Sequence, residues 1–515
     1  MANDESEGYV TDIEYTAGYY PFLNPLRMAF SLLLEGIAAP PPGPCCELGF
    51  GQGLSLALHA AGDVSRRWWG NDFNPAQVLN AQELVAASGV DALVSKQSFE
   101  AFCKRPDLPE FAAISLHGIW SWVSPANRAH IVDFASRQLM PGGVLFLSYN
   151  TMPRCAEELP LRQLLLDHDR LASPAGRDRT LRSGEALAFA QRVAAVDSQW
   201  VLQAPKIRAR ISELMEDTAS YVVHEFMHQH WQPTSFVEVA DHLQPAHVDY
   251  VCSTEPLDRF VDLQWTPEQQ KLLASIESPM LRQSVGDLLS SQRIRRDLWV
   301  RGARRLTRAE QVERLRAQLL VLIQDRRDVP RKVKGRCGEV TLAPAHTGAL
   351  FDVLTAADGP VLLGTLFDHL SARGVAIEDT LVLVSFLVGL HAVAPALDAA
   401  KTAASRPATD RLNAHLLQRA VRRQDLGELV SPVTAGAVQV PPTSQLMLCA
   451  YLEAPGDPQS WPARVWQLMQ DNDQVLLRQG RPVTDRSAAL AMLAAQLPQL
   501  QDRTLPMLRR LQVLN

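Results

Sequence analysis

Short apolar runs alternate with segments of helical periodicity through residues 1–156. Each apolar run has the length of a strand, and each periodic segment that follows has the length of a helix. This alternation predicts an α/β domain in which helices cover both faces of a parallel sheet. The expected strands are residues 45–48, 68–72, 111–116 and 144–148, and the expected helices are residues 25–38, 54–61, 75–88 and 125–139.

The pattern changes beyond residue 156. Residues 157–232 are polar and largely helical in period, and a capped helix at 236–243 and a strand at 248–251 follow them. This order predicts a helical insertion over the ligand crevice, after which the sheet resumes. Ligands of such sheets bind beyond the carboxyl ends of the strands.

The second half of the chain reads as mostly helical, and its pattern indicates no chemistry. Four arginines interleaved with acidic residues are expected on a solvated helix face; they are Arg301, Arg304, Arg305 and Arg308. We therefore divide the chain into the core 1–156, the insertion 157–232, the returning sheet 233–265, a helical middle region 266–340 and a C-terminal helical domain 341–515.

Composition narrows the function classes. The 515 residues are 47% apolar and 21% charged, which is ordinary for a globular protein with a large core, and the net charge of −6 argues against a dedicated nucleic-acid binder. The seven cysteines are scattered without a CxxC pair, which favours a reducing compartment. The acidic start of the chain lacks a signal-peptide pattern, and the longest apolar run, at 381–390, is too short to span a membrane. We expect a cytoplasmic protein without a membrane span or a nucleic-acid partner.

A glycine loop follows the first expected strand. Glu47, Gly49, Gly51 and Gly53 form the pattern ExGxGxG between a strand and a helix, and Asp72 ends the next strand. Glycine lets the backbone approach a ligand closely. The dinucleotide pattern GxGxxG does not fit, because the third glycine comes one position too early. An acid at Asp72 suits the two ribose hydroxyls, and Glu47 suits a cationic ammonium but would repel a pyrophosphate. The loop therefore indicates S-adenosylmethionine (AdoMet) as the cofactor.

Two further residues are candidates for the adenine. Ser98 and Phe99 follow the expected third strand, and Phe99 is placed to stack on a purine ring. The alternative is that Phe99 is an ordinary core residue.

The acceptor side is expected where the fourth and fifth strands end. His117, Trp120 and Trp122 follow the fourth strand, and Tyr149 and Asn150 end the fifth. Transfer of a methyl group by in-line displacement requires that the two reactants are aligned and that water is excluded from the site. An amine acceptor must first lose a proton. We expect His117 or Tyr149 to receive that proton and the two tryptophans to bind the acceptor. Core packing of the tryptophans is the alternative.

The N-terminal tyrosines extend this aromatic set. Tyr15, Tyr19 and Tyr20 are expected to form a lid over the cofactor and, with the tryptophans, a wall that holds an ammonium group by cation–π contact. The alternative is that these rings only close the cofactor pocket.

At these residues the chain resembles the class I methyltransferases that carry a methyltransferase regulatory domain. The resemblance rests on the segments 9–16, 24–25, 47–53, 72–75, 117–122 and 149–151, and on 221–253 and 296–302 for the regulatory domain. It implies a Rossmann-like AdoMet-binding fold and cofactor contacts at Tyr15, Phe50, Phe73 and His117. Position 50 carries phenylalanine where cysteine or serine is frequent in such loops, but this position contributes mainly backbone.

The resemblance extends to the rickettsial lysine methyltransferases that modify outer-membrane protein B. It implies N-methylation of protein lysines, although one fold serves many acceptors. Three activities stay open: a protein lysine methyltransferase, a small-molecule methyltransferase with a closed pocket, and a non-catalytic AdoMet-binding interaction protein. The oligomeric state is also open, with a homodimer as one alternative.

A second motif competes with this interpretation. His224, Glu225 and His228 match the zinc-protease pattern HExxH. A third ligand and the glycine and histidine that follow in metzincins are missing, so we expect no metal here. His224 is instead expected at the crevice mouth, beside the acceptor, with core packing as the alternative.

Overall fold

The computed structural model describes residues 18–174, 176–196, 198–228, 230–478 and 481–514. Within these residues, seven strands form a central sheet in the order β3-β2-β1-β4-β5-β7-β6. Strands β1 to β5 are parallel, and β7 is antiparallel to both β5 and β6. The strands are β1 Cys45–Leu48, β2 Trp68–Asp72, β3 Ala92–Lys96, β4 Phe111–Leu116, β5 Leu139–Asn150, β6 Val248–Ser253 and β7 Ile294–Arg301.

Alternating side chains place the sheet between two apolar layers. Cys45 and Phe146 face one layer with α2 and α3, whereas Cys46 and Leu145 face the other with α4, α5 and α12. Neighbouring residues of a strand point to opposite faces, so one apolar run serves both cores. The helices are α1 Pro25–Leu34, α2 Leu54–Gly62, α3 Pro75–Ser88, α4 Phe99–Cys103, α5 Pro125–Gln138 and α12 Phe236–Leu243. The predicted α/β fold with a parallel-dominated sheet is therefore confirmed.

Asparagine and serine side chains define the starts of these helices. Asn24 caps α1, Asn74 caps α3 and Ser124 caps α5, and each helix has proline in its first turn. Each cap accepts a hydrogen bond from a backbone N–H that has no partner within the helix.

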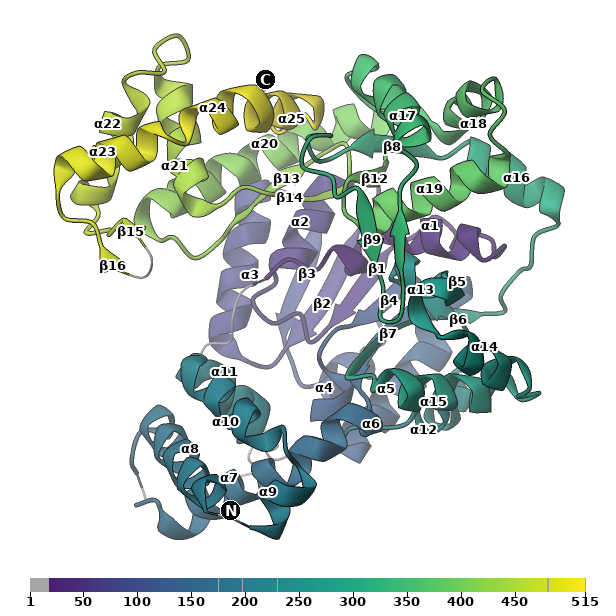
Figure 1. The fold of residues 1–515 in the computed structure, drawn as a ribbon, viewed down its shortest axis with the longest axis vertical. Coiled ribbons are helices and arrows are strands. Elements are labelled where there is room, and N and C mark those ends of the chain that lie inside the picture. Colours follow the sequence, from purple (N-terminus) through teal and green to yellow (C-terminus); the bar gives the residue numbers. More distant parts are fainter. Residues whose placement is uncertain (1–17, 175, 197, 229, 479–480, 515) are drawn as a thin grey trace.

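A helical segment between β5 and β6 has a small core of its own. Leu161, Leu187 and Phe226 are among the buried residues that pack together there. Figure 1 shows its helices at the lower end of the molecule, below the sheet. They are α6 Met152–Cys155, α7 Leu159–Ala172, α8 Arg179–Ala195, α9 Gln199–Gln203, α10 Ile207–Glu216 and α11 Ala219–Phe226.

The last part of the chain packs on α2 and α3. Leu412 and Leu446 belong to the same core as Leu54, and Arg411 donates to the carbonyl of Ser88. Figure 1 shows these helices at the end of the molecule opposite the helical segment. The elements are α20 Ala399–Arg422, β13 Glu428–Ser431, β14 Gly436–Gln439, α21 Pro442–Glu453, α22 Trp461–Asp471, β15 Leu477–Arg478, β16 Arg481–Pro482, α23 Arg486–Ala494, α24 Leu497–Gln499 and α25 Leu505–Arg510.

A second core joins α1 to a small three-stranded sheet of order β11-β8-β12, in which Phe30 packs with Leu320 and Phe367. Its elements are α16 Arg308–Arg316, β8 Leu319–Leu322, β9 Lys332–Lys334, β10 Glu339–Thr341, α17 Pro344–Ala356, β11 Val361–Leu362, α18 Leu363–Ser371, α19 Ile377–Gly389 and β12 Val393–Ala396. Among the described residues, no helix combines the length and the apolar character needed to cross a membrane.

The region 266–340, expected to be helical, also contributes a central strand. Helices α13 Val261–Gln264, α14 Pro267–Ala274 and α15 Pro279–Ser290 lead into β7, which lies between β5 and β6. The expected helix is wrong, although Arg304, Arg305 and Arg308 are exposed as expected. Arg301 ends β7 and donates to the carbonyl of Leu139, Arg304 and Arg305 lie in the following loop, and the helix begins only at Arg308.

Candidate active site

The loop between β1 and α2 contains three glycines in the left-handed region. The φ angles of Gly49, Gly51 and Gly53 are +67°, +59° and +72°. A Cβ atom on Gly49 would lie 2.4 Å from Ile119, and one on Gly53 would lie 2.4 Å from Ala81. A Cβ atom on Gly51 would meet nothing within 4 Å. Two glycines therefore permit tight packing, and the middle one leaves open space in front of the loop.

Asp72 is bound to this loop. The backbone N–H of Gly51 donates to one carboxylate oxygen at 3.0 Å, and that of Asn74 donates to the other at 2.9 Å. The parallel register pairs Leu48 with Asn71, which places the end of β2 beside the loop. Burial raises the pKa of Asp72 to about 6, against the lowering effect of these hydrogen bonds.

Glu47 lies beneath the loop and is 4% exposed. Among the described residues, its Oε2 atom is buried without a hydrogen-bond partner. Burial, followed by the charge of Asp72, raises the pKa of Glu47 to about 8. A buried carboxylate without a partner is costly, so the site favours a cationic group that would neutralise it.

This pKa predicts that binding of a cationic ligand depends on pH. Near pH 7 Glu47 holds a proton that a cation must displace, so affinity for S-adenosylhomocysteine (AdoHcy), the demethylated product of AdoMet, should rise up to about tenfold per pH unit below pH 8. Isothermal titration in buffers of different ionisation enthalpy measures the released proton. Glu47→Gln should flatten the profile, and an unchanged pH dependence in that variant would exclude Glu47 as its source.

Two small cavities adjoin the loop and share Gly49, Asp72, Ile119 and Trp122 in their linings. The first, of about 120 Å³, is lined by Gly18, Tyr20, Glu47, Gly49, Phe50, Gly51, Gln52, Gly53, Leu54, Asp72, Gln77, His117, Gly118, Ile119, Trp122, His224 and Glu225. The second, of about 50 Å³, is lined by Gly49, Asn71, Asp72, Phe73, Gln97, Ser98, Phe99, Ile119, Trp122, Val123, Ser124, Asn127, His228 and His230. We call the two cavities together the crevice.

The crevice brings together most of the predicted cofactor residues. Phe73, Ser98 and Phe99 line the second cavity, whereas Glu47, Gly51 and His117 line the first. The Phe50 ring is 6% exposed and belongs to the core, so only its backbone serves the loop. Tyr15 lies outside the described residues. The contacts of these residues with a cofactor stay predictions.

His117 lines the first cavity in a fixed orientation. Its Nδ1 is 2.8 Å from the hydroxyl of Ser148, which also accepts a hydrogen bond from the Gly118 N–H. Tyr20 and Phe22 pack against the ring with centroid distances of 4.2 and 4.8 Å. Burial, aided by the charge of Arg296, lowers the pKa of His117 to about 3. The imidazole is therefore neutral at pH 7.

Two predicted residues lie away from the crevice. Trp120 is fully buried in the core beside α5, where Arg128 donates to its carbonyl. Tyr149 faces the opposite side of β5 from Ser148, and its hydroxyl donates to Asp297 at 2.9 Å. Neither residue lines the two cavities. The predicted acceptor contact of Trp120 and the predicted proton transfer by Tyr149 are therefore wrong.

Asn150 does not line either cavity but binds the aromatic side chain of Trp231. Its Oδ1 accepts a hydrogen bond from the Trp231 indole at 3.1 Å. The Trp231 ring stacks on Trp122 with a centroid distance of 5.8 Å, and Trp122 lines both cavities. Asn150 thus positions the aromatic wall rather than touching the crevice. Trp231 was not predicted as a site residue because its distance from Trp122 in sequence hides their contact.

The HExxH residues do not form a zinc-protease helix. Helix α11 ends at Phe226, so His228 lies beyond it and faces the second cavity, while His224 and Glu225 line the first. Among the described residues, no group of three possible ligands could hold a metal ion. Tyr20 lines the crevice, whereas the Tyr19 hydroxyl contacts His59 at 3.2 Å and is absent from the crevice lining.

The strand order, the glycine loop and the acid on β2 define the class I methyltransferase fold. The chain superposes on PKMT2 from Rickettsia typhi in complex with AdoHcy with a TM-score of 0.66 and 14% identity, over 96% of this chain and 99% of that chain. Residues 218–301 match the family described as a predicted methyltransferase regulatory domain. The chain therefore has the class I methyltransferase fold.

Two curated proteins are similar to this chain in sequence. The uncharacterized protein sll1526 of Synechocystis sp. is 27% identical over 510 residues, which are 98% of this chain and 99% of that protein. The uncharacterized protein RP789 of Rickettsia prowazekii is 26% identical over 235 residues, which are 42% of this chain and 41% of that protein. The architecture of the whole chain thus recurs in a cyanobacterial protein.

Proposed function

We propose that this chain is an AdoMet-dependent methyltransferase whose acceptor is a protein lysine. The observation that carries the proposal is the crevice itself, in which an open Gly51 backbone lies beside two buried carboxylates, Glu47 and Asp72. The similar fold of PKMT2 from Rickettsia typhi has been solved in complex with AdoHcy, and this likeness supports the proposal.

The residues present fit AdoMet. The Oε2 atom of Glu47, which has no hydrogen-bond partner among the described residues, suits the methionine ammonium, and Asp72 at the end of β2 suits the ribose hydroxyls. Phe99, which is 8% exposed, lines the second cavity where a purine ring would stack. When bound, AdoMet supplies a methyl group on an activated sulfonium centre.

The remaining residues of the crevice position the acceptor amine. Trp122 and Tyr20 offer aromatic faces to a lysine ammonium, and such contacts contribute on the order of 0.5–2 kcal/mol each. His117 is too weak a base to hold a proton at pH 7. Glu225, from α11, lines the same cavity and its charge raises the pKa of Tyr20 together with burial and Glu47. We therefore assign the proton of the lysine ammonium to Glu225 and an orienting role to His117.

Cofactor binding tests the first part of the proposal. Asp72→Ala should weaken AdoHcy by at least about tenfold in isothermal titration, because the ribose hydroxyls and the Gly51 N–H lose their shared acceptor. Asp91→Ala, which removes an exposed carboxylate paired with Arg67, should leave the affinity unchanged. Absence of any binding heat with AdoMet and AdoHcy in the unmodified chain would reject the proposal.

Acceptor labelling tests the second part. AdoMet with a labelled methyl group, incubated with the chain and candidate proteins, should place label on lysine side chains, as read by peptide mass spectrometry. Label recovered only in small molecules or in nucleic acid would overturn the lysine assignment while leaving the methyltransferase proposal intact.

A further inference from the structure

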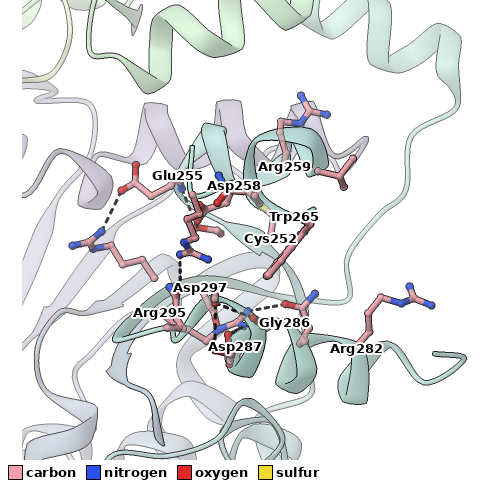
Figure 2. A pocket seen from close by; sticks show the side chains of 18 of the residues that line it. Cys252, Glu255, Asp258, Arg259, Trp265, Arg282, Gly286, Asp287, Arg295 and Asp297 are labelled. Carbon is pink, nitrogen blue, oxygen red and sulfur yellow. Dashed lines mark hydrogen bonds and ion pairs between the residues drawn. The ribbon is translucent and has the colours of Figure 1, made fainter. Parts of the chain in front are cut away.

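A cavity much larger than the crevice lies beside it. It has a volume of about 1070 Å³, whereas the two crevice cavities have about 120 and 50 Å³. We call it the side cavity. Its walls come from the ends of α1, β6 and β7, from the segment 255–265, and from α14 and α15, with Arg336 from the β9–β10 turn (Figure 2). Its volume is at the upper end of the range of about 300–1,000 Å³ that is usual for ligand sites.

The side cavity opens at the same edge of the sheet as the crevice. The first residues of β7 pair with the last residues of β5, since Ile294 lies opposite Asn150. One aromatic ring separates the two spaces. The guanidinium of Arg296, which lines the side cavity, lies 4.7 Å from the ring centre of Phe22, and Phe22 packs against His117 in the crevice. The two spaces therefore lie on either side of Phe22, close enough for one acceptor segment to reach both.

Each carboxylate of the side cavity already has a partner. Asp287 and Asp297 both pair with Arg295 at 2.8 Å, as Figure 2 shows at the base of the cavity. The other three also have partners: Glu35 pairs with Arg259 at 3.3 Å, Glu255 with Arg27 at 3.1 Å, and Asp258 accepts from Ser253 at 2.8 Å.

The arginines of the side cavity are not all neutralised. Among the described residues, Arg282 and Arg336 form no ion pair with a carboxylate, and Arg336 donates to the side-chain oxygen of Gln292. Arg296 has only Glu255, at 3.6 Å, which Arg27 already engages more closely. Its Nε is buried without an acceptor among these residues. The cavity therefore has positive charge and N–H donors to spare, in a chain whose net charge is −6.

We propose that the side cavity binds carboxylate groups of an acidic acceptor segment, while the lysine of that segment lies in the crevice. Arginine presents N–H donors in a planar fork that suits carboxylates. The inference rests on the proposed function and refines it: the preferred acceptor is a lysine flanked by glutamate or aspartate.

Peptide binding tests this inference. A fluorescent, end-blocked Glu-Glu-Lys-Glu-Glu peptide and its analogue Gln-Gln-Lys-Gln-Gln are titrated by anisotropy into the full chain saturated with AdoHcy. The acidic peptide should bind about fivefold more tightly at low salt, and the difference should shrink as ionic strength rises. Equal affinity of the two peptides would overturn the inference.

Two variants of Arg336 test whether the side cavity causes the preference for the acidic peptide. Arg336→Gln should reduce the preference to below about twofold, and Arg336→Glu should reverse it, because the side chain is exposed and forms no direct ion pair among the described residues, acting on Asp258 and Asp287 only from a distance. Arg314→Gln removes an exposed arginine of α16 outside the cavity and is the matched control. A preference for the acidic peptide that Arg336→Glu leaves unchanged would also overturn the inference.

The same titrations show whether the bound anion belongs to a peptide or is a free small molecule. They also test the anionic site independently of the methyltransferase proposal. Tricarballylate, a free tricarboxylate, should compete with the acidic peptide; if it binds while the peptides show no difference, the cavity serves a separate small anion and the inference fails. Titration of AdoHcy alone reports the proposed function. If the chain binds no AdoHcy but still shows an Arg336-dependent preference for the acidic peptide, the methyltransferase proposal is rejected and the anionic site is retained.

Discussion

A Gly51→Val variant will fold but bind AdoHcy more than about 100-fold more weakly than the unmodified chain. The Gly51 backbone lines the crevice, and the space where its Cβ would project is empty to 4 Å. A branched side chain would fill that space and exclude a ligand that must approach the backbone closely. Isothermal titration measures the affinity, and thermal unfolding shows whether the variant remains folded.

Backbone strain is the competing explanation, and a second glycine controls for it. Gly302 also has a left-handed φ of +61° and open space around its Cβ position, but it is not part of the crevice. Gly302→Val should incur the same strain, about 1–2 kcal/mol, and keep its affinity for AdoHcy. A Gly51→Val variant that binds AdoHcy as well as Gly302→Val does would show that the loop does not hold the cofactor.

The cofactor side of the crevice was predictable because it depends on backbone conformation. Glycines at 49, 51 and 53 leave few alternatives for a turn between a strand and a helix, and Asp72 follows from the parallel register of the next strand. Most predicted strands and helices of residues 45–138 begin and end within a residue or two of the observed ones, because their apolar runs are buried and bounded by a cap or a turn. The helix predicted at 25–38 ends at residue 34, and the strand predicted at 144–148 spans 139–150.

The acceptor side was harder to predict because it depends on the direction of single side chains. Trp120 and Trp122 lie in one turn of 3₁₀-helix, too short for a periodic pattern, and only the second reaches the crevice. Trp231 reaches Trp122 from the helical segment, and this contact depends on how that segment folds back over the sheet. The sequence shows such residues but not which of them meet.

Strand β7 was missed for a related reason. Its first half contains Arg295, Arg296 and Asp297, which read as a polar surface. In the structure Arg295 and Asp297 are buried and form an ion pair with each other. Charged residues are therefore not a sign of solvent exposure in this strand. Apart from Ile294 at its start, the apolar residues of β7 are the run Leu298, Trp299 and Val300, and so short a run cannot distinguish a strand from a helix.

This buried pair should stabilise the whole sheet. Asp297, whose side chain is 2% exposed, accepts from both Arg295 and Tyr149. Asp297→Ala would leave the buried Arg295 guanidinium with one carboxylate, Asp287, besides the Gln283 side-chain oxygen, and would remove the acceptor of the buried Tyr149 phenol. We expect a loss of about 3–5 kcal/mol in the free energy of unfolding, seen as a clear fall in the midpoint of thermal unfolding. Asp107→Ala, which breaks an exposed pair with Arg105, should cost less than about 1 kcal/mol.

The same variant should reduce methyl transfer, because Tyr149 lies between two residues that position the site. Ser148 orients His117, and Asn150 holds Trp231 against Trp122. Asp297→Asn keeps an acceptor for the Tyr149 hydroxyl but loses the negative charge, so its stability and activity should lie between those of Asp297→Ala and the unmodified chain. If Asp297→Ala unfolds at the same temperature as Asp107→Ala, the buried pair does not stabilise β7, and the fixed geometry of the acceptor side must come from the helical segment instead.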